Sequence, residues 1–206
     1  MAAARDQALQ AFLDALKAAI EAGKDSASPQ AATAAKRAFA ALEAPGDAAA
    51  PPRETVPATR YIKGALTDSQ KGPAAALAEA FERIEPRLAW RRRPDRETSD
   101  PNFPNAHAST VIIGDGGIEM RDDVRIGVSL LAPNTFYPDH HHPPEEVYVV
   151  LTEGAWRQGD GPWNERDPGT LVYNTPNITH AMQSGSKPLL AIWTLPMTDA
   201  PTIATA

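Results

Sequence analysis

The first third of the chain carries apolar residues at helical spacing. Large apolar side chains recur every three or four positions from residue 9 to residue 20, and Gly23 follows as a helix stop. A second helix is predicted to begin at Ser28, a good capping residue, with Pro29 at its first position. A third is predicted over residues 73–84, and the Pro- and Ala-rich residues 43–60 are typical of a connector. The stripe of the first helix consists of Leu9, Phe12, Leu13, Leu16 and Ile20.

These helices are rich in alanine and contain few large apolar residues. They cannot bury much surface alone, because alanine contributes little apolar area. We therefore expect them to pack either on the rest of the chain or on a second subunit, which makes a homodimer possible.

After Leu88 the pattern changes to short β-branched or apolar runs separated by Gly, Pro and Asn turns. Several short strands at this spacing are typical of a sandwich or barrel. The sequence predicts a mostly β protein with two parts: an α-helical N-terminal region, residues 1–88, and a small β-barrel or jelly roll, residues 89–206. The expected strands lie at residues 109–114, 124–132, 145–154, 169–174 and 188–195.

Composition excludes several classes of function. The net charge is -6 and the pI about 5.4, so a nucleic-acid partner is not expected. The one basic run, Arg91 to Arg93, is interpreted as a solvated linker. The absence of cysteine excludes disulfides, zinc–thiolate sites and thiol nucleophiles. Polar residues interrupt the N-terminus and no run is long enough to span a bilayer, so we expect a cytoplasmic protein without a membrane partner.

The candidate chemistry is concentrated in one short stretch. Three of the five histidines are consecutive, at residues 140–142. Residues two apart in a strand share a face, which places His140 with His142, and Glu146 with Tyr148. His180 is the attractive donor from a distant strand. Imidazole and carboxylate form a mixed ligand set suited to iron, manganese, zinc, nickel or copper, so a metal site is predicted. The other histidines, His107 and His141, are interpreted as surface or loop residues.

The spacing of these residues resembles the two motifs of the cupin superfamily, whose members are small β-barrels with one metal ion inside. Such motifs predict the fold better than the reaction. A tyrosine two residues after the glutamate distinguishes the chain from a generic cupin, and the whole pattern is similar to the cupin-type dimethylsulfoniopropionate lyases of marine bacteria. The first motif is His140-x-His142, Glu146 and Gly154, the second Pro168-Gly169, Pro176 and His180, and the narrower likeness adds Tyr137 and Tyr148.

The resemblance implies one transition-metal ion per chain, held by His142, Glu146, Tyr148 and His180. A generic cupin would use His140 in place of Tyr148, and both assignments stay open at this point. Iron or zinc is expected first, with manganese, cobalt and nickel as further candidates.

The implied substrate is a small sulfonium carboxylate, dimethylsulfoniopropionate, which β-elimination converts to acrylate and dimethyl sulfide. A cation lowers the pKa of a neighbouring tyrosine, which can then accept the proton. Tyr137 is the first candidate for this base and Tyr148 the second, with His140 orienting or relaying the proton. Aromatic faces bind cations such as a sulfonium. Trp193 is the residue predicted to bind substrate in this way; Phe136, Tyr173 and Trp156 are further candidates.

Two other functions fit the same motifs. One is a different metal-dependent cupin enzyme, such as a dioxygenase or an isomerase, and a dioxygenase would consume oxygen. The other is a non-enzymatic cupin that binds a small molecule. Release of dimethyl sulfide without oxygen would separate the lyase from both.

Overall fold

The computed structural model describes residues 4–26, 28–93 and 101–197. All three predicted helices are present, and Ser28 caps the second by accepting a hydrogen bond from the amide of Ala31. A further helix, α3, lies in the segment that follows the connector. The helices are α1 (Gln7–Gly23), α2 (Pro29–Ala41), α3 (Ile62–Ser69), α4 (Ala75–Ile84) and the short α5 (Phe103–Ala106).

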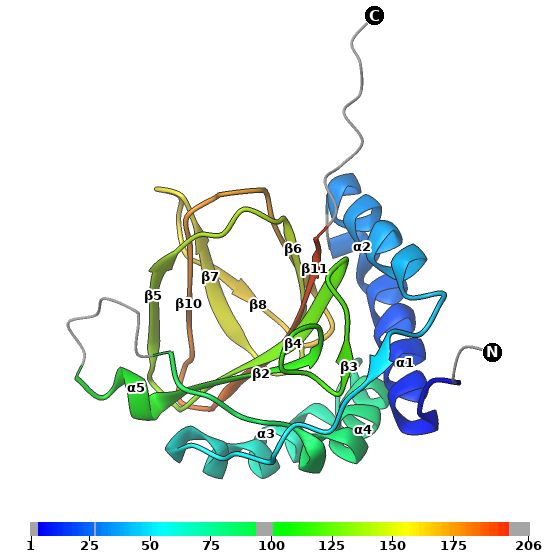
Figure 1. Cartoon of the computed structure of the whole chain (residues 1–206). Coiled ribbons are helices and arrows are strands. Elements are labelled where there is room, and N and C mark those ends of the chain that lie inside the picture. The colour runs from blue at the N-terminus through cyan, green and yellow to red at the C-terminus, as the bar shows by residue number, and fades with distance from the viewer. Residues whose placement is uncertain (1–3, 27, 94–100, 198–206) are drawn as a thin grey trace, which may run out of the picture.

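The strands form two sheets that face each other as a barrel (Figure 1). The larger sheet has seven strands in the order β1-β3-β2-β4-β11-β6-β9, and the smaller has four in the order β5-β10-β7-β8. This is the small barrel with an α-helical N-terminal extension that the cupin motifs predict. The strands are β1 (Asp47–Ala48), β2 (His107–Ile113), β3 (Glu119–Met120), β4 (Val124–Leu131), β5 (Phe136–His140), β6 (Glu146–Val150), β7 (Gly154–Gln158), β8 (Asn164–Arg166), β9 (Leu171–Asn174), β10 (His180–Gln183) and β11 (Leu189–Pro196).

The larger sheet is buried on both faces, and each face belongs to a different cluster of apolar side chains. Along β6, Val149 packs in the cluster that contains the helices, whereas Tyr148 and Val150 pack inside the barrel. The same alternation holds on β11, where Ile192 faces the helices and Ala191 faces the interior. The candidate site residues of this sheet therefore point into the barrel, and the residues next to them in sequence pack against the helices.

Helices α1 to α4 lie against the outer face of the larger sheet (Figure 1). All five residues of the predicted stripe of α1 are buried there, and so are Leu77, Phe81 and Ile84 of α4. The alanine-rich helices thus pack on the barrel of the same chain, which is one of the two surfaces expected for them. No helix in the described ranges is both long enough and apolar enough to cross a bilayer.

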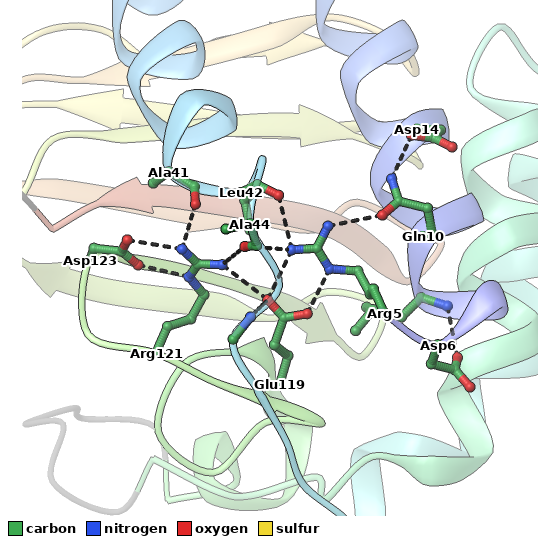
Figure 2. A network of polar contacts seen from close by, with 12 residues as sticks. Arg5, Asp6, Gln10, Asp14, Ala41, Leu42, Ala44, Glu119, Arg121 and Asp123 are labelled. Carbon is green, nitrogen blue, oxygen red and sulfur yellow. Dashed lines mark hydrogen bonds and ion pairs between the residues drawn. The ribbon is translucent and has the colours of Figure 1, made fainter. Parts of the chain in front are cut away.

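A buried ion cluster joins the first residues of the described chain to β3 (Figure 2). Glu119 accepts hydrogen bonds from the Arg5 guanidinium at 2.6 and 3.1 Å and from the backbone amide of Gly46 at 2.9 Å. Arg121 donates to Glu119 at 3.1 Å and pairs with Asp123 at 2.7 Å. Both arginines also donate to backbone carbonyls just after α2, where the helix dipole favours positive charge.

Candidate metal centre and its cavity

Three of the predicted ligands converge at one end of the barrel. The ligand atoms of His142, Glu146 and His180 all lie within 4.8 Å of one another. Glu146 begins β6, His180 begins β10, and His142 follows the end of β5. Because β6 belongs to the larger sheet and β10 to the smaller, the cluster bridges the two sheets at the barrel end.

The two imidazoles present the correct nitrogen to the cluster. Nδ1 of His142 lies 2.8 Å from the carbonyl oxygen of Pro144, and Nδ1 of His180 lies 3.0 Å from that of Ile178. A carbonyl accepts only, so each Nδ1 carries the hydrogen and each Nε2 keeps its lone pair. Both Nε2 atoms lie 3.4 Å from Oε2 of Glu146. This is the arrangement in which a backbone acceptor orients a metal-binding histidine.

Glu146 is held as a carboxylate by its surroundings. Burial alone would raise its pKa, but the adjacent imidazoles of His142 and His180 hold the pKa well below its usual range. Asn174 donates from Nδ2 to Oε2 of Glu146 at 2.9 Å, and Asn174 Oδ1 in turn accepts from Gln158 at 2.6 Å. A buried anion with fixed donors around it can accept a cation without rearranging.

An unpaired buried nitrogen and the types of donor atom both indicate that this cluster can bind a metal ion. Nε2 of His180 is buried and has no hydrogen-bond partner among the described residues. Two imidazole nitrogens and one carboxylate oxygen also match the donors preferred by first-row transition metals. The structure thus contains a His/Glu site suited to one metal ion.

Tyr148 and His140 are the two candidates for the next ligand, and both lie beside this cluster. The ring centroids of His140 and His180 are 4.0 Å apart, since the two residues pair directly across β5 and β10. Tyr148 is buried two residues along β6 from Glu146. Burial raises the pKa of Tyr148 well above its usual value, and the charge of Glu146 raises it further. The phenol is therefore neutral when no cation is bound.

Tyr137 lies on the opposite sheet and belongs to a cluster of rings that meet it edge to face or tilted. Its ring centroid lies 4.4 Å from that of His140, 4.7 Å from that of His107 and 5.3 Å from that of Phe103. The interpretation of His107 as a surface or loop residue is wrong, because it is buried in β2 and stacks on Phe103. His141 is exposed, as predicted.

A cavity of about 1120 Å³ opens beside the cluster. Tyr137, His140, Glu146, Tyr148 and Trp193 all line it, so it reaches most of the residues selected from the sequence. The run of residues 91–93 also lines it, with Arg91 and Arg92 exposed as the interpretation as a solvated linker expects and Arg93 partly buried.

The other aromatic candidates lie in different surroundings. Phe136 is 40% exposed and packs against Trp163 outside the cavity. Trp156 is buried beneath Tyr148, with ring centroids 6.0 Å apart. Tyr173 lines the cavity but donates its hydroxyl hydrogen to Glu145 at 2.5 Å. Among the predicted aromatic residues, Trp193, Tyr137, Tyr148 and Tyr173 line the cavity.

The sequence pattern did not identify several residues of the site. Asn174 reaches Glu146 because β6 pairs with β9, and Gln158 reaches Asn174 because the two sheets meet at this end. Polar residues at the end of a strand are common in turns, so no local signal could have selected them.

Comparison with known proteins decides the family. A model of the dimethylsulfoniopropionate lyase family matches residues 30–191, which is well over half of the chain. The chain belongs to the dimethylsulfoniopropionate lyase family. The match includes all but the first residue of α2, every strand from β1 to β10 and all the candidate ligands.

Individual relatives agree with this membership. The chain is 29% identical to DddL of Cereibacter sphaeroides over 138 residues, 65% of this chain and 56% of the relative. It is 26% identical to the dimethylsulfoniopropionate lyase DddQ of Ruegeria pomeroyi over 132 residues, 63% of this chain and 66% of the relative. These alignments thus span less than two thirds of each relative. The crystal structure of DddQ from Ruegeria pomeroyi DSS-3 has the same fold, with a TM-score of 0.68, 23% identity and coverage of 98% of this chain and 95% of that one.

Proposed function

We propose that this protein cleaves dimethylsulfoniopropionate into acrylate and dimethyl sulfide by β-elimination. The observation that carries the proposal is a His/Glu metal cluster beside two buried tyrosines in one cavity, in a chain of the dimethylsulfoniopropionate lyase family. The cavity is large enough for this small substrate, and its wall offers aromatic and charged groups for both ends of the molecule.

His142, Glu146 and His180 would hold the metal, with Tyr148 as the fourth ligand and His140 as the alternative. Iron or zinc suits this set best, since it contains imidazole, carboxylate and phenol. When bound, the ion would supply positive charge that stabilises the enolate-like carboxylate formed as the proton leaves. Asn174 keeps the Glu146 carboxylate in one orientation through its 2.9 Å hydrogen bond.

Tyr137 is the proposed base. As the phenolate, its oxygen accepts the proton from the carbon next to the substrate carboxylate. The electron pair left behind forms the carbon–carbon double bond, and the carbon–sulfur bond breaks with its electrons going to sulfur. The leaving group is neutral dimethyl sulfide, so no acid is needed. His140, whose ring lies 4.4 Å from that of Tyr137, would orient it or relay its proton. Tyr148 is the second candidate for the base.

Headspace gas chromatography tests the activity directly. Purified protein would be loaded with iron(II) or zinc and incubated with dimethylsulfoniopropionate without oxygen, and a parallel sample would contain a chelator. Metal-dependent release of dimethyl sulfide and an equal amount of acrylate is expected. No release with any metal tested would refute the proposal, and release that requires oxygen would indicate a dioxygenase.

Two substitutions separate the roles of the residues. His180→Ala should remove bound metal and activity together, because it takes away a buried ligand. Tyr137→Phe should retain stoichiometric metal but lower turnover by at least about 100-fold, the usual contribution of a positioned base. The control is His141→Ala, which changes an exposed histidine of the same cluster. If His180→Ala retained the metal, the proposed ligand set would be wrong. If Tyr137→Phe had wild-type turnover, Tyr137 would be excluded as the base.

A further inference from the structure

Arg125 lies on the same inner surface of the barrel as the metal cluster. Trp193 of β11 pairs with Tyr148 of β6 on one side and with Gly127 of β4 on the other. Residues two positions apart in a strand share a face. Glu146, Leu195 and Arg125 are each two positions from Tyr148, Trp193 and Gly127, respectively, and Leu195 pairs with Arg125. Neighbouring strands are about 4.8 Å apart, so the backbones of Glu146 and Arg125 are separated by about 10 Å. An extended arginine side chain can cover much of that distance.

The guanidinium of Arg125 has no anion of its own within the described part of the chain. Its Nε is buried without a hydrogen-bond partner, and the guanidinium forms no ion pair with any described residue. Arg37, another arginine of the cavity wall, pairs with Glu145 instead. A half-buried arginine without a partner loses hydration and gains no ion pair in return, which is costly unless a ligand supplies the missing charge.

Neighbouring residues hold the Arg125 side chain in the cavity. Its Cγ lies against Gly114, where a Cβ would come within 2.9 Å. Its guanidinium carbon lies 6.0 Å from the ring centroid of Trp193. The Trp193 ring in turn lies directly over Gly127, where a Cβ would come within 2.2 Å of Cζ2. Two glycines therefore allow this pair of side chains to lie along the cavity wall.

We propose that Arg125 binds the carboxylate of the substrate, an inference that rests on the proposed function. The planar guanidinium donates two parallel hydrogen bonds to a carboxylate, and its charge favours the enolate-like form as the proton leaves. The same charge repels a sulfonium. Trp193 is then part of the carboxylate end of the cavity, which changes the expectation that its ring holds the sulfonium. The sulfonium would lie toward the tyrosines.

Carboxylate binding can be measured without turnover. Calorimetric titration with propionate, and with the neutral propionamide as reference, would be performed on metal-loaded protein and on protein treated with chelator. Arg125→Met should weaken propionate binding about 10- to 100-fold in both states, as expected for hydrogen bonds to a charged group, and leave propionamide unchanged. Arg125→Lys keeps the positive charge but loses the two parallel donors of the guanidinium, so its propionate affinity should lie between those of the wild type and Arg125→Met. Arg83→Met, at an exposed position of α4, is the matched control and should match the wild type.

Turnover of dimethylsulfoniopropionate provides the second readout. Both Arg125 variants should lower kcat/KM in the same order as they weaken propionate binding, with thermal unfolding used to confirm that they fold. Wild-type propionate affinity and kcat/KM in Arg125→Met would overturn the assignment while leaving the lyase proposal intact. If the wild type releases no dimethyl sulfide, the lyase proposal fails, yet Arg125-dependent propionate binding would still support a carboxylate site.

Discussion

Replacing Glu119 by alanine removes the centre of the ion cluster in Figure 2. The Glu119 side chain is 3% exposed, and its partners Arg5 and Arg121 are 6% and 10% exposed. The change deletes two hydrogen bonds from Arg5 and one each from Arg121 and the amide of Gly46. Breaking a buried ion pair by removing one partner costs about 3–5 kcal/mol.

The lower end of that range is expected for Glu119→Ala. Arg121 keeps Asp123 at 2.7 and 2.9 Å, and Arg5 keeps the carbonyl of Leu42 at 2.9 Å, so neither cation loses every partner. A loss of about 3 kcal/mol should lower Tm by about 6–12 °C in a chain of this length. Differential scanning calorimetry at pH 7 would measure it. Glu153→Ala, at an exposed position, is the matched control and should change Tm by less than about 2 °C.

Acidity adds a second test with a defined sign. Burial would raise the pKa of Glu119, but hydrogen bonds from Arg5, Gly46 and Arg121 hold it below its usual value. A carboxyl group whose pKa is lowered in the folded state stabilises the protein above its unfolded pKa and loses this contribution as the pH falls through the folded pKa. The difference in stability between wild type and Glu119→Ala should thus be constant near neutral pH and shrink below about pH 4. A Tm difference under about 2 °C at pH 7, or one that grows with acidity, would refute the reasoning.

Two further substitutions test the site and the sheet behind it. Asn174→Ala should weaken metal binding about 10- to 100-fold, because it removes the donor that orients Glu146; competition with a chromophoric chelator would measure this, and affinity equal to that of the exposed control Asn164→Ala would exclude the role. Gly127→Val should cost about 1–3 kcal/mol and alter tryptophan fluorescence, because its Cβ would lie 2.2 Å from Trp193 and 2.3 Å from the backbone oxygen of Thr110. An unchanged denaturation midpoint would show that both neighbours can move aside.

Much of the fold could be predicted from local pattern. The apolar stripe of α1 and the Ser28 cap of α2 predict their helices because both signals act within a few residues of sequence. Strands β7 and β10 were not predicted from the sequence, for the opposite reason. Strands such as β10 have four residues, and their conformation depends on the strands paired on both sides.

Some residues of the candidate site could also be predicted from local sequence, and others could not. His142, Glu146 and His180 could be selected because a spaced histidine–glutamate motif and a distant histidine are rare without a metal. Arg125 could not, since an arginine within a strand has no unusual local context. Its role depends on which residue of β11 stands opposite, and a shift of one residue would turn its side chain to the helices.

The two buried faces of the larger sheet explain how the helical region relates to the site. All five residues of β6 are buried, because the larger sheet is covered on both faces. Val147 and Val149 pack toward the helices, and Glu146 and Tyr148 face the barrel interior. One hydrophobic cluster extends across the boundary proposed near residue 88, and strand β1 lies before it while helix α5 lies after it. The helices therefore support the site by burying the outer face of the strand that carries its carboxylate, and α2 also contributes Arg37 to the cavity wall.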